Sequence, residues 1–305
     1  MIRGLRLTDV PLQLLPGRLP GEDLATTHDE IARAKHYLRP IELARWSVAP
    51  SRNERHFAVT RHGRLDALVV LRLRHGPRAW EVAHLFARRG VDEAVADLLE
   101  RAVAYVASQR GERLFLRVAH RSPIQQIAET AGFRVVVAEE VYTLARSMTG
   151  DLHTPRMDVR PPLPADRYGI FRLYNAAYAP EARAAIGLTL DQWQDSLEGG
   201  SGVREYVWEQ QGSIRGWVRF DQRGSSVAVD ALIHPDEGNQ AAAFVSYVAQ
   251  LAWGHQSPMW IVPAQQAALV EALQSRGWQH SRAYVVLART VPTPIREVAF
   301  GAVQA

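Results

Sequence analysis

Two carboxylates and two tyrosines lie at matching places in the two halves of the chain, and their chemistry fits proton transfer. Glu81 and Asp230 each lie in a short apolar segment that predicts a β-strand, and Tyr142 and Tyr284 lie in later strand-like segments. A carboxylate in a cleft can accept the proton of an amine, and a phenol can protonate a leaving group. The structural alternatives are strand carboxylates that face solvent or pair with arginine, and tyrosines that only pack. Both explanations stay open for all four residues.

Two segments can bind an anion, because each leads into the start of a predicted helix. One is FARRGVDEAV, which contains Arg88 and Arg89, and the other is HPDEGNQAAAFV, which begins at His234. Helix N-termini bind phosphate through free N–H groups and the helix dipole. The first helical turns also hold acids that favour the helix but repel an anion: Asp92, Glu93, Asp236 and Glu237. Plain helix capping is therefore the alternative, and the two arginines favour the first segment as the anion site.

The order of predicted elements occurs twice, which indicates two domains of similar fold. Segments 131–146 and 276–289 both begin with a Gly-aromatic turn and end in Leu-Ala-Arg. Hydrophobic periodicity predicts the order α-α-β-β-β-α-β-α-β in each half. The predicted domains are 1–150 and 155–305, joined by a proline-rich linker at 147–164.

The elements themselves are predicted from capping residues, alternation and helical stripes. Capping boxes at Thr27 and Thr189 open the first helices, the earlier one extending toward Trp46, and long helices follow Val91 and precede Leu251. Aromatic residues on the helices of the second half either line a pocket or pack in the core: Tyr174, Tyr178 and Trp193. The predicted strands are 56–60, 65–73 (after a turn at 62–63), 80–86, 113–118, 205–209, 214–220, 227–233 and 259–262.

Composition limits the classes of function. The 305 residues include no cysteine, which excludes disulfides, thiolate metal sites and cysteine nucleophiles. The 11 histidines show no metal-ligand spacing, so no metal is expected. The net charge of +4 is concentrated in the first half and is too small to predict nucleic-acid binding. No apolar run is long enough to cross a membrane and no signal peptide is evident, so a cytoplasmic protein is expected.

The element order, the His-Pro after the third strand and the Gly-aromatic turns resemble the GNAT acyltransferase superfamily. The resemblance implies two GNAT-like domains in tandem, an α/β (α+β) fold in which each mixed, mainly antiparallel sheet is flanked by helices. It also implies acyl-CoA as co-substrate, with a thioester attacked by an amine, a base that accepts the amine proton and often a tyrosine as acid. The thioester carbonyl is expected at the N–H groups of Leu85 and Phe86, or of Leu232 and Ile233.

The phosphate loop of the family has the pattern Arg/Gln-x-x-Gly-x-Gly/Ala, which this chain matches only in part. In the second half the pattern falls on Gly238, Ala241 and Ala243, and in the first half on Val91, Ala94 and Ala96. A second register in the first half uses Arg89 and Gly90. The places of the family's acid tyrosine hold Ala128 and Leu273, and those of its asparagine hold Arg121 and Gln266. The cofactor-binding residues implied around the two loops are Arg88, Arg89, Glu93, Ala94, Val95, Gly238 and Ala241.

Three functions follow from the resemblance. The first is an acyl-CoA-dependent N-acyltransferase, of which N-acetyltransferase is the commonest kind, acting on a small-molecule or peptide amine; the basic first half is the expected CoA binder. The second is a non-catalytic scaffold or small-molecule-binding protein, which the incomplete motifs favour. The third is an aminoacyl transferase of the Fem type, which requires a basic surface of tRNA size.

Overall fold

The computed structural model of the chain describes residues 2–9, 19–33, 38–49, 51–61, 64–144, 157–199, 202–223, 226–252 and 257–292. The predicted turn at 62–63, the Ala-Arg end of the first repeat at 145–146 and the linker up to residue 156 lie outside these ranges. The boundary between the predicted domains 1–150 and 155–305 falls there too.

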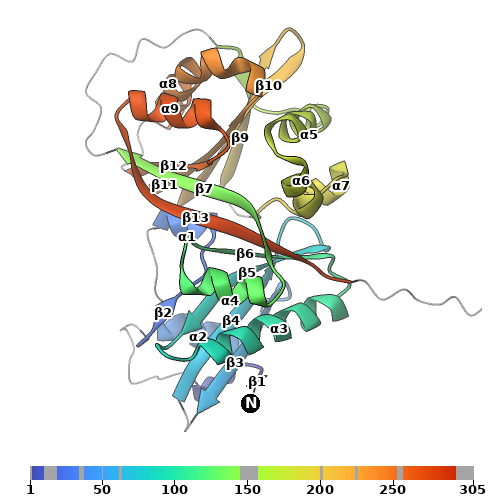
Figure 1. Cartoon of the computed structure of the whole chain (residues 1–305), viewed down its shortest axis with the longest axis vertical. Helices are drawn as coiled ribbons and strands as arrows, with labels where there is room; N and C mark the ends of the chain where they lie inside the picture. Colours follow the sequence, from blue (N-terminus) through green and yellow to red (C-terminus); the bar gives the residue numbers. More distant parts are fainter. Residues whose placement is uncertain are drawn as a thin grey trace, which may run out of the picture.

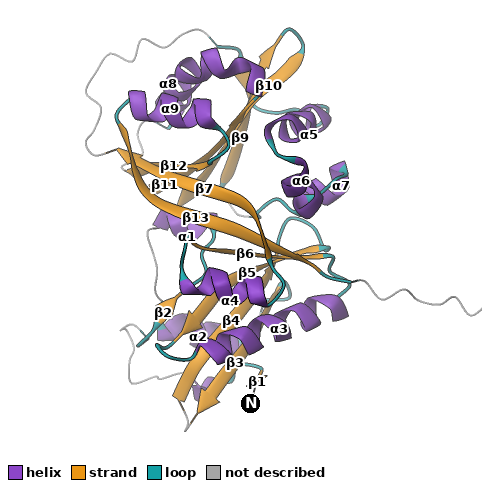
Figure 2. Cartoon of the chain, in the orientation of Figure 1, coloured by secondary structure: helices purple, strands orange, loops and turns teal. Residues whose placement is uncertain are grey.

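The element order predicted for each half is observed, with short edge strands, 3-10 turns and one extra helix added (Figure 2). The first half contains β1 (Ile2–Arg3), η1 (Leu7–Asp9), β2 (Glu22–Asp23), α1 (His28–Arg33), α2 (Pro40–Val48), β3 (Glu54–Arg61), β4 (Arg64–Leu73), β5 (Ala79–Ala87), α3 (Asp92–Ser108), β6 (Arg113–Ala119), α4 (Pro123–Thr130) and β7 (Arg134–Leu144). The second half contains β8 (Val159–Arg160), α5 (Asp166–Ala177), α6 (Pro180–Ile186), α7 (Leu190–Asp195), β9 (Val203–Gln210), β10 (Ser213–Arg223), β11 (Ser226–Ile233), η3 (Pro235–Gln240), α8 (Ala241–Leu251), β12 (Ser257–Pro263), α9 (Ala267–Ser275) and β13 (Trp278–Thr290).

The two halves share one mixed, mainly antiparallel sheet in which their last strands are exchanged. The strand order is β1-β3-β4-β5-β6-β13-β7-β12-β11-β10-β9-β8. The last strand of the second half, β13, pairs with β6 of the first half, and the last strand of the first half, β7, pairs with β12 of the second. In Figure 1, β7 (green) and β13 (red) cross the middle of the molecule side by side. Each half therefore depends on the other to complete its sheet.

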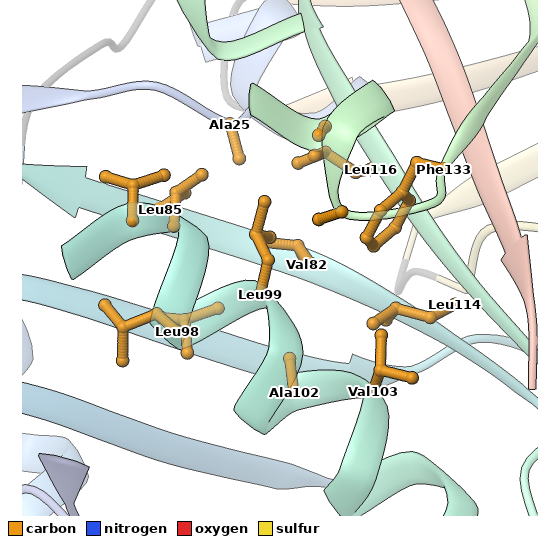
Figure 3. Packing of buried hydrophobic residues seen from close by; sticks show 14 of the residues in the cluster. Ala25, Val82, Leu85, Leu98, Leu99, Ala102, Val103, Leu114, Leu116 and Phe133 are labelled. Carbon is orange, nitrogen blue, oxygen red and sulfur yellow. The ribbon is translucent and has the colours of Figure 1, made fainter. Parts of the chain in front are cut away.

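Helices cover both faces of this sheet because side chains of its central strands are apolar on both sides. On one face, α3 and α4 pack over Leu85 of β5 and Leu116 of β6 (Figure 3). On the opposite face, Phe115 of β6 shares a cluster with Val137 of β7 and Ile186 of α6. Since neighbouring residues of a strand point to opposite faces, α3 and α4 lie on one side of β6 and α6 on the other.

Each half contains one pair of parallel strands that diverge, and the predicted carboxylates lie where they part. β5 pairs with β6 only from Ala79 to Glu81, and β11 pairs with β12 only from Ser226 to Asp230. Glu81 and Asp230 are thus the last paired residues before each splay, as expected for equivalent positions in a repeat. Among the described helices, none is long and apolar enough to cross a membrane.

Candidate functional site

The splay of the first half is filled by residues 22–27, which we call the plug segment. β2 lies antiparallel to the end of β5. The Leu24 N–H donates to the Leu85 carbonyl on β5 at 2.8 Å, and the Thr26 N–H donates to the Arg117 carbonyl on β6 at 3.0 Å. The plug segment therefore bridges both strands of the splay with backbone hydrogen bonds.

The plug segment also takes the backbone N–H predicted to hold a thioester carbonyl. The Leu85 N–H donates to Asp23 Oδ1 at 2.9 Å. Phe86 is buried in the core beneath α2 and is the partner of Asp23 in the strand pairing. Ala25 is buried in the same hydrophobic cluster as Leu85, beneath α3 (Figure 3). In this conformation the plug segment occupies the place that the resemblance gives to a pantetheine arm.

A groove of about 550 Å³ remains outside the plug segment, where the ends of β5 and β6 diverge. Four residues predicted from the sequence meet around it. Arg88, Arg89 and Gly90 line it from the β5–α3 loop, and Tyr284 lines it from β13. Gly90 has φ 78°, a left-handed conformation that lets the loop turn sharply into α3. The groove thus combines a helix N-terminus with basic side chains, as an anion site requires.

The remaining first-half predictions are placed differently. Ala94 and Val95 are buried in the core beneath α3, while Glu93 is exposed. The Arg88 Nε donates to the Leu65 carbonyl at 2.9 Å, and the Arg89 guanidinium is almost fully exposed, 3.7 Å from a carboxylate oxygen of Glu22. Among these side chains, Arg89 is the one most free to reach a ligand.

The corresponding turn of the second half is closed by its own residues. The Ile233 N–H donates to the Gln266 side-chain oxygen at 3.2 Å. A Cβ on Gly238 would lie 3.5 Å from the Cβ of Ala268, so η3 packs directly on α9. Ala241 is buried at the start of α8. These contacts leave the turn as a packing element, and they do not favour it as a phosphate site.

Two arginines form ion pairs with Glu81. Its carboxylate lies 2.6 Å from Arg72 Nη2 and 3.1 Å from Arg74 Nε, and its side chain is 3% exposed. Each of its two oxygens accepts a hydrogen bond from a guanidinium group, and the side chain lines neither the groove nor the cavity between the two halves. Arg74 also lies 3.5 Å from Glu198, which connects Glu81 to the second half.

Asp230 pairs with a histidine that comes from the first half. His28 Nδ1 lies 3.0 Å from Asp230 Oδ2 and 3.7 Å from Glu198 Oε2. Burial lowers the pKa of His28, but the charges of Asp230 and Glu198 outweigh it and raise the pKa to about 10. Arg117 Nη2 also lies 3.0 Å from His28 Nε2, and the structure links Glu81 to Asp230 through Arg74, Glu198 and His28.

Arg117 and Glu139 complete this buried charged network. Arg117 Nε donates to Glu139 at 2.7 Å, and its Nη2 donates to Glu198 at 2.6 Å. Burial raises the pKa of Glu139, yet the charge of Arg117 outweighs this and lowers it to about 2. Sequence reasoning missed His28, Arg117, Glu139 and Glu198, since their partners lie far away along the chain. Only their occurrence as charged residues near or within apolar segments could have drawn attention to them.

The network borders a central cavity of about 120 Å³ between the two halves. Asp230 and Leu232 line it from the splay of the second half, and Phe115 lines it from β6 of the first. The three aromatic residues predicted as pocket or core residues all line it: Tyr174, Tyr178 and Trp193. The cavity is therefore lined by aromatic side chains and by the residues of the charged network.

The two tyrosines predicted as acids are not brought together. Tyr142 packs in the core beneath α8 and α9 and donates its hydroxyl hydrogen to Glu140, and burial followed by that contact raises its pKa to about 12. Asp230 faces the central cavity on the other side of the sheet. Tyr284 lines the groove instead. The geometry thus places Tyr142 away from both the groove and the cavity.

A histidine–carboxylate cluster lies beside the plug segment. His84 Nδ1 is 2.6 Å from Asp23 and 3.2 Å from Glu30, and the three residues lie close enough to share a metal ion. Burial lowers the pKa of His84, but both carboxylates raise it to about 9. The cluster joins β5 to the plug segment and to α1.

Comparisons with known proteins confirm the fold predicted by resemblance. In sequence comparisons, no protein-family model and no curated protein matches the chain. In structural comparison, the chain is similar to a GCN5-related N-acetyltransferase from Sphaerobacter thermophilus, with 13% identity, a TM-score of 0.54 and coverage of 97% of this chain and 96% of the other. It is also similar to a putative acetyltransferase from Pyrococcus horikoshii, with 10% identity, a TM-score of 0.51 and coverage of 97% and 91%. At these identities the likeness shows the fold, two GNAT-like domains in tandem.

Proposed function

We propose that the protein is an acyl-CoA-dependent N-acyltransferase with one active site built from both halves. The observation that carries the proposal is the position of the plug segment. On its outer side lies the groove with Arg88 and Arg89, and the chain that follows it enters the central cavity at His28. If the plug segment withdraws, the splay between β5 and β6 becomes a passage from the groove to the cavity.

In this proposal the groove holds the CoA phosphates, and the pantetheine arm replaces the plug segment along β5. The Leu85 N–H, released by Asp23, then donates to the thioester carbonyl. The acceptor amine lies in the cavity and attacks the carbonyl carbon, the C–S bond breaks, and the amine proton passes through a carboxylate to the CoA thiolate. Asp230 is better placed than Glu81 to accept that proton. Its side chain is 16% exposed and has one ion-pair partner within 4 Å among the described residues.

The test is calorimetric titration with acetyl-CoA together with thiol release in the presence of an amine panel. We expect binding that Arg88→Gln with Arg89→Gln weakens and that the exposed Arg134→Gln, which lies outside the groove, leaves unchanged. No heat and no thermal shift at millimolar acetyl-CoA, in the wild type and in a variant with a weakened plug segment, would refute the proposal.

A second candidate is a non-catalytic binding protein on the same fold. It is favoured by one observation, that both splays are filled by the chain's own groups: the plug segment in the first half and Gln266 in the second. It predicts that ligands bind the cavity while no amine releases thiol from acetyl-CoA. Thiol release that Asp230→Asn abolishes would exclude it.

A further inference from the structure

Arg219 on β10 is a buried cation without a carboxylate partner. Its exposed fraction is 4%, and its Nη2 donates to the Glu198 carbonyl oxygen at 2.7 Å. Its Nε has no hydrogen-bond partner, and within the described ranges no carboxylate lies within ion-pair distance of its guanidinium. A buried, unpaired guanidinium destabilises the fold. Such a group is explained when a ligand supplies the missing anion.

A second unpaired donor lies on the same strand. Trp217 is two residues before Arg219, so both point to the same face of the sheet, and both line the central cavity. The indole Nε1–H of Trp217 is buried and has no hydrogen-bond partner. Two unsatisfied donors on one wall of a cavity match the two oxygens of a carboxylate.

An anion and a cation site lie next to each other in this cavity. Arg219 is directly opposite Asp230 in the β10–β11 pairing. Directly opposed residues of antiparallel strands have Cβ atoms about 5 Å apart. The two side chains nevertheless form no ion pair with each other in the described structure, and Asp230 pairs with His28. Neighbouring charges of opposite sign, held apart, fit a zwitterion whose carboxylate and amine share one carbon.

Part of the remaining lining is apolar and can contact an apolar substituent on that carbon, while Arg74, Arg117, Glu139 and Glu198 form its charged part. The cavity walls also include Phe115, Tyr178 and Trp193. Aromatic walls bind apolar and aromatic groups through burial and ring stacking. We propose that the central cavity, whose volume of about 120 Å³ excludes large rings, binds an α-amino acid with a small apolar side chain, its carboxylate on Arg219 and Trp217 and its amine toward Asp230. The inference rests on the proposed function in one respect: in that reaction the amine of the bound amino acid is the acyl acceptor.

The test is direct binding without CoA, using matched pairs that differ only in the carboxylate. The probes are alanine with ethylamine, valine with 2-methylpropylamine, and leucine with 3-methylbutylamine, titrated by calorimetry. We expect each amino acid to bind about 10- to 100-fold more tightly than its amine, as a hydrogen bond to a charged group provides. In Arg219→Gln this preference falls to less than about threefold, and Trp217→Phe, which keeps the packing, reduces it in the same direction.

The control is Arg160→Gln. Arg160 pairs with Glu209 at 2.6 Å and does not line the cavity, so its loss leaves the preference unchanged. Equal binding of acids and amines by the wild type, or no binding by any probe, overturns the inference. Equal weakening of both members of each pair in Arg219→Gln also overturns it. Amino-acid binding without any acetyl-CoA binding supports the inference and refutes the proposed function. Turnover of the amines at the same rate as the amino acids supports the proposed function and overturns the inference.

Discussion

Replacing Asp23 by alanine is expected to tighten acetyl-CoA binding while it lowers the stability of the fold. Asp23 holds the plug segment through two contacts, with the Leu85 N–H at 2.9 Å and with His84 Nδ1 at 2.6 Å. A hydrogen bond to a charged group contributes about 1.5–3 kcal/mol. Loss of both therefore weakens the closed position of the plug segment by about 3–6 kcal/mol, less whatever neighbouring groups recover.

The effect on affinity follows from population shift. A ligand that requires an open state has its apparent Kd raised by the rarity of that state. Since each 1.4 kcal/mol is about a factor of ten, Asp23→Ala is expected to lower the apparent Kd of acetyl-CoA at least about tenfold. The alanine removes no group that the ligand needs, because the Leu85 N–H is the donor proposed for the thioester carbonyl. Glu30 remains 3.2 Å from His84, which keeps that imidazolium paired.

The assay is calorimetric titration of wild type and variant, with thermal unfolding measured in parallel. Asp9→Ala is the matched control, because Asp9 is also buried and pairs with an arginine, Arg3, at 2.6 Å, but lies outside the groove. It should lower the unfolding temperature without changing the Kd. Unchanged or weaker acetyl-CoA binding by Asp23→Ala, with a folded variant, would show that the plug segment is a permanent part of the sheet.

Three further predictions concern stability. Because the pKa of His28 is raised from 6.5 to about 10, its pairing stabilises the fold fully below pH 6.5, and this stabilisation is lost as the pH rises through 10. The free energy of unfolding, measured by urea denaturation, should therefore fall between these pH values, and it should fall less in His28→Gln. Arg117→Met leaves Glu139 and Glu198 without their main partner and should lower the free energy of unfolding by about 3–5 kcal/mol, measured by urea denaturation. Gly277→Ala should lower it by about 1 kcal/mol, because Gly277 has φ 82°; no change in its urea midpoint would contradict this.

The local elements were predictable because each depends on a short stretch of sequence. Short apolar segments at 80–86 and 227–233 predicted β5 and β11 within a residue or two. The Gly-aromatic turns were also correct in kind: Gly132 and Gly277 have φ 81° and 82°, a conformation that few other residues adopt. The Thr189 capping prediction is confirmed by the hydrogen bond from the Gln192 N–H to the Thr189 hydroxyl at 3.3 Å. The helix predicted from Thr27 toward Trp46 is wrong: α1 ends at Arg33 and α2 begins at Pro40, a residue that favours the first turn of a new helix.

The features that join the halves were not predictable in the same way. The exchange of β7 and β13 depends on pairing between strands far apart in sequence. The plug segment has no hydrophobic period, because it alternates between backbone contacts to β5 and β6. His28 lies beside Asp230 because the plug segment crosses the splay and α1 follows it directly. These arrangements are set by tertiary packing, which single-sequence patterns do not carry.

The proposed function explains why the family motifs are incomplete in both halves. The first half keeps a groove on the phosphate side, but its carboxylate, Glu81, is locked by arginines. The second half keeps a partly exposed Asp230 beside a cavity, but its phosphate turn is closed by Gln266. A single active site needs one phosphate site and one acceptor site, so each half can lose what the other retains. The shared sheet and the buried network from Glu81 to Asp230 then hold the two remaining parts in a fixed relation, which two flexibly linked domains would lack.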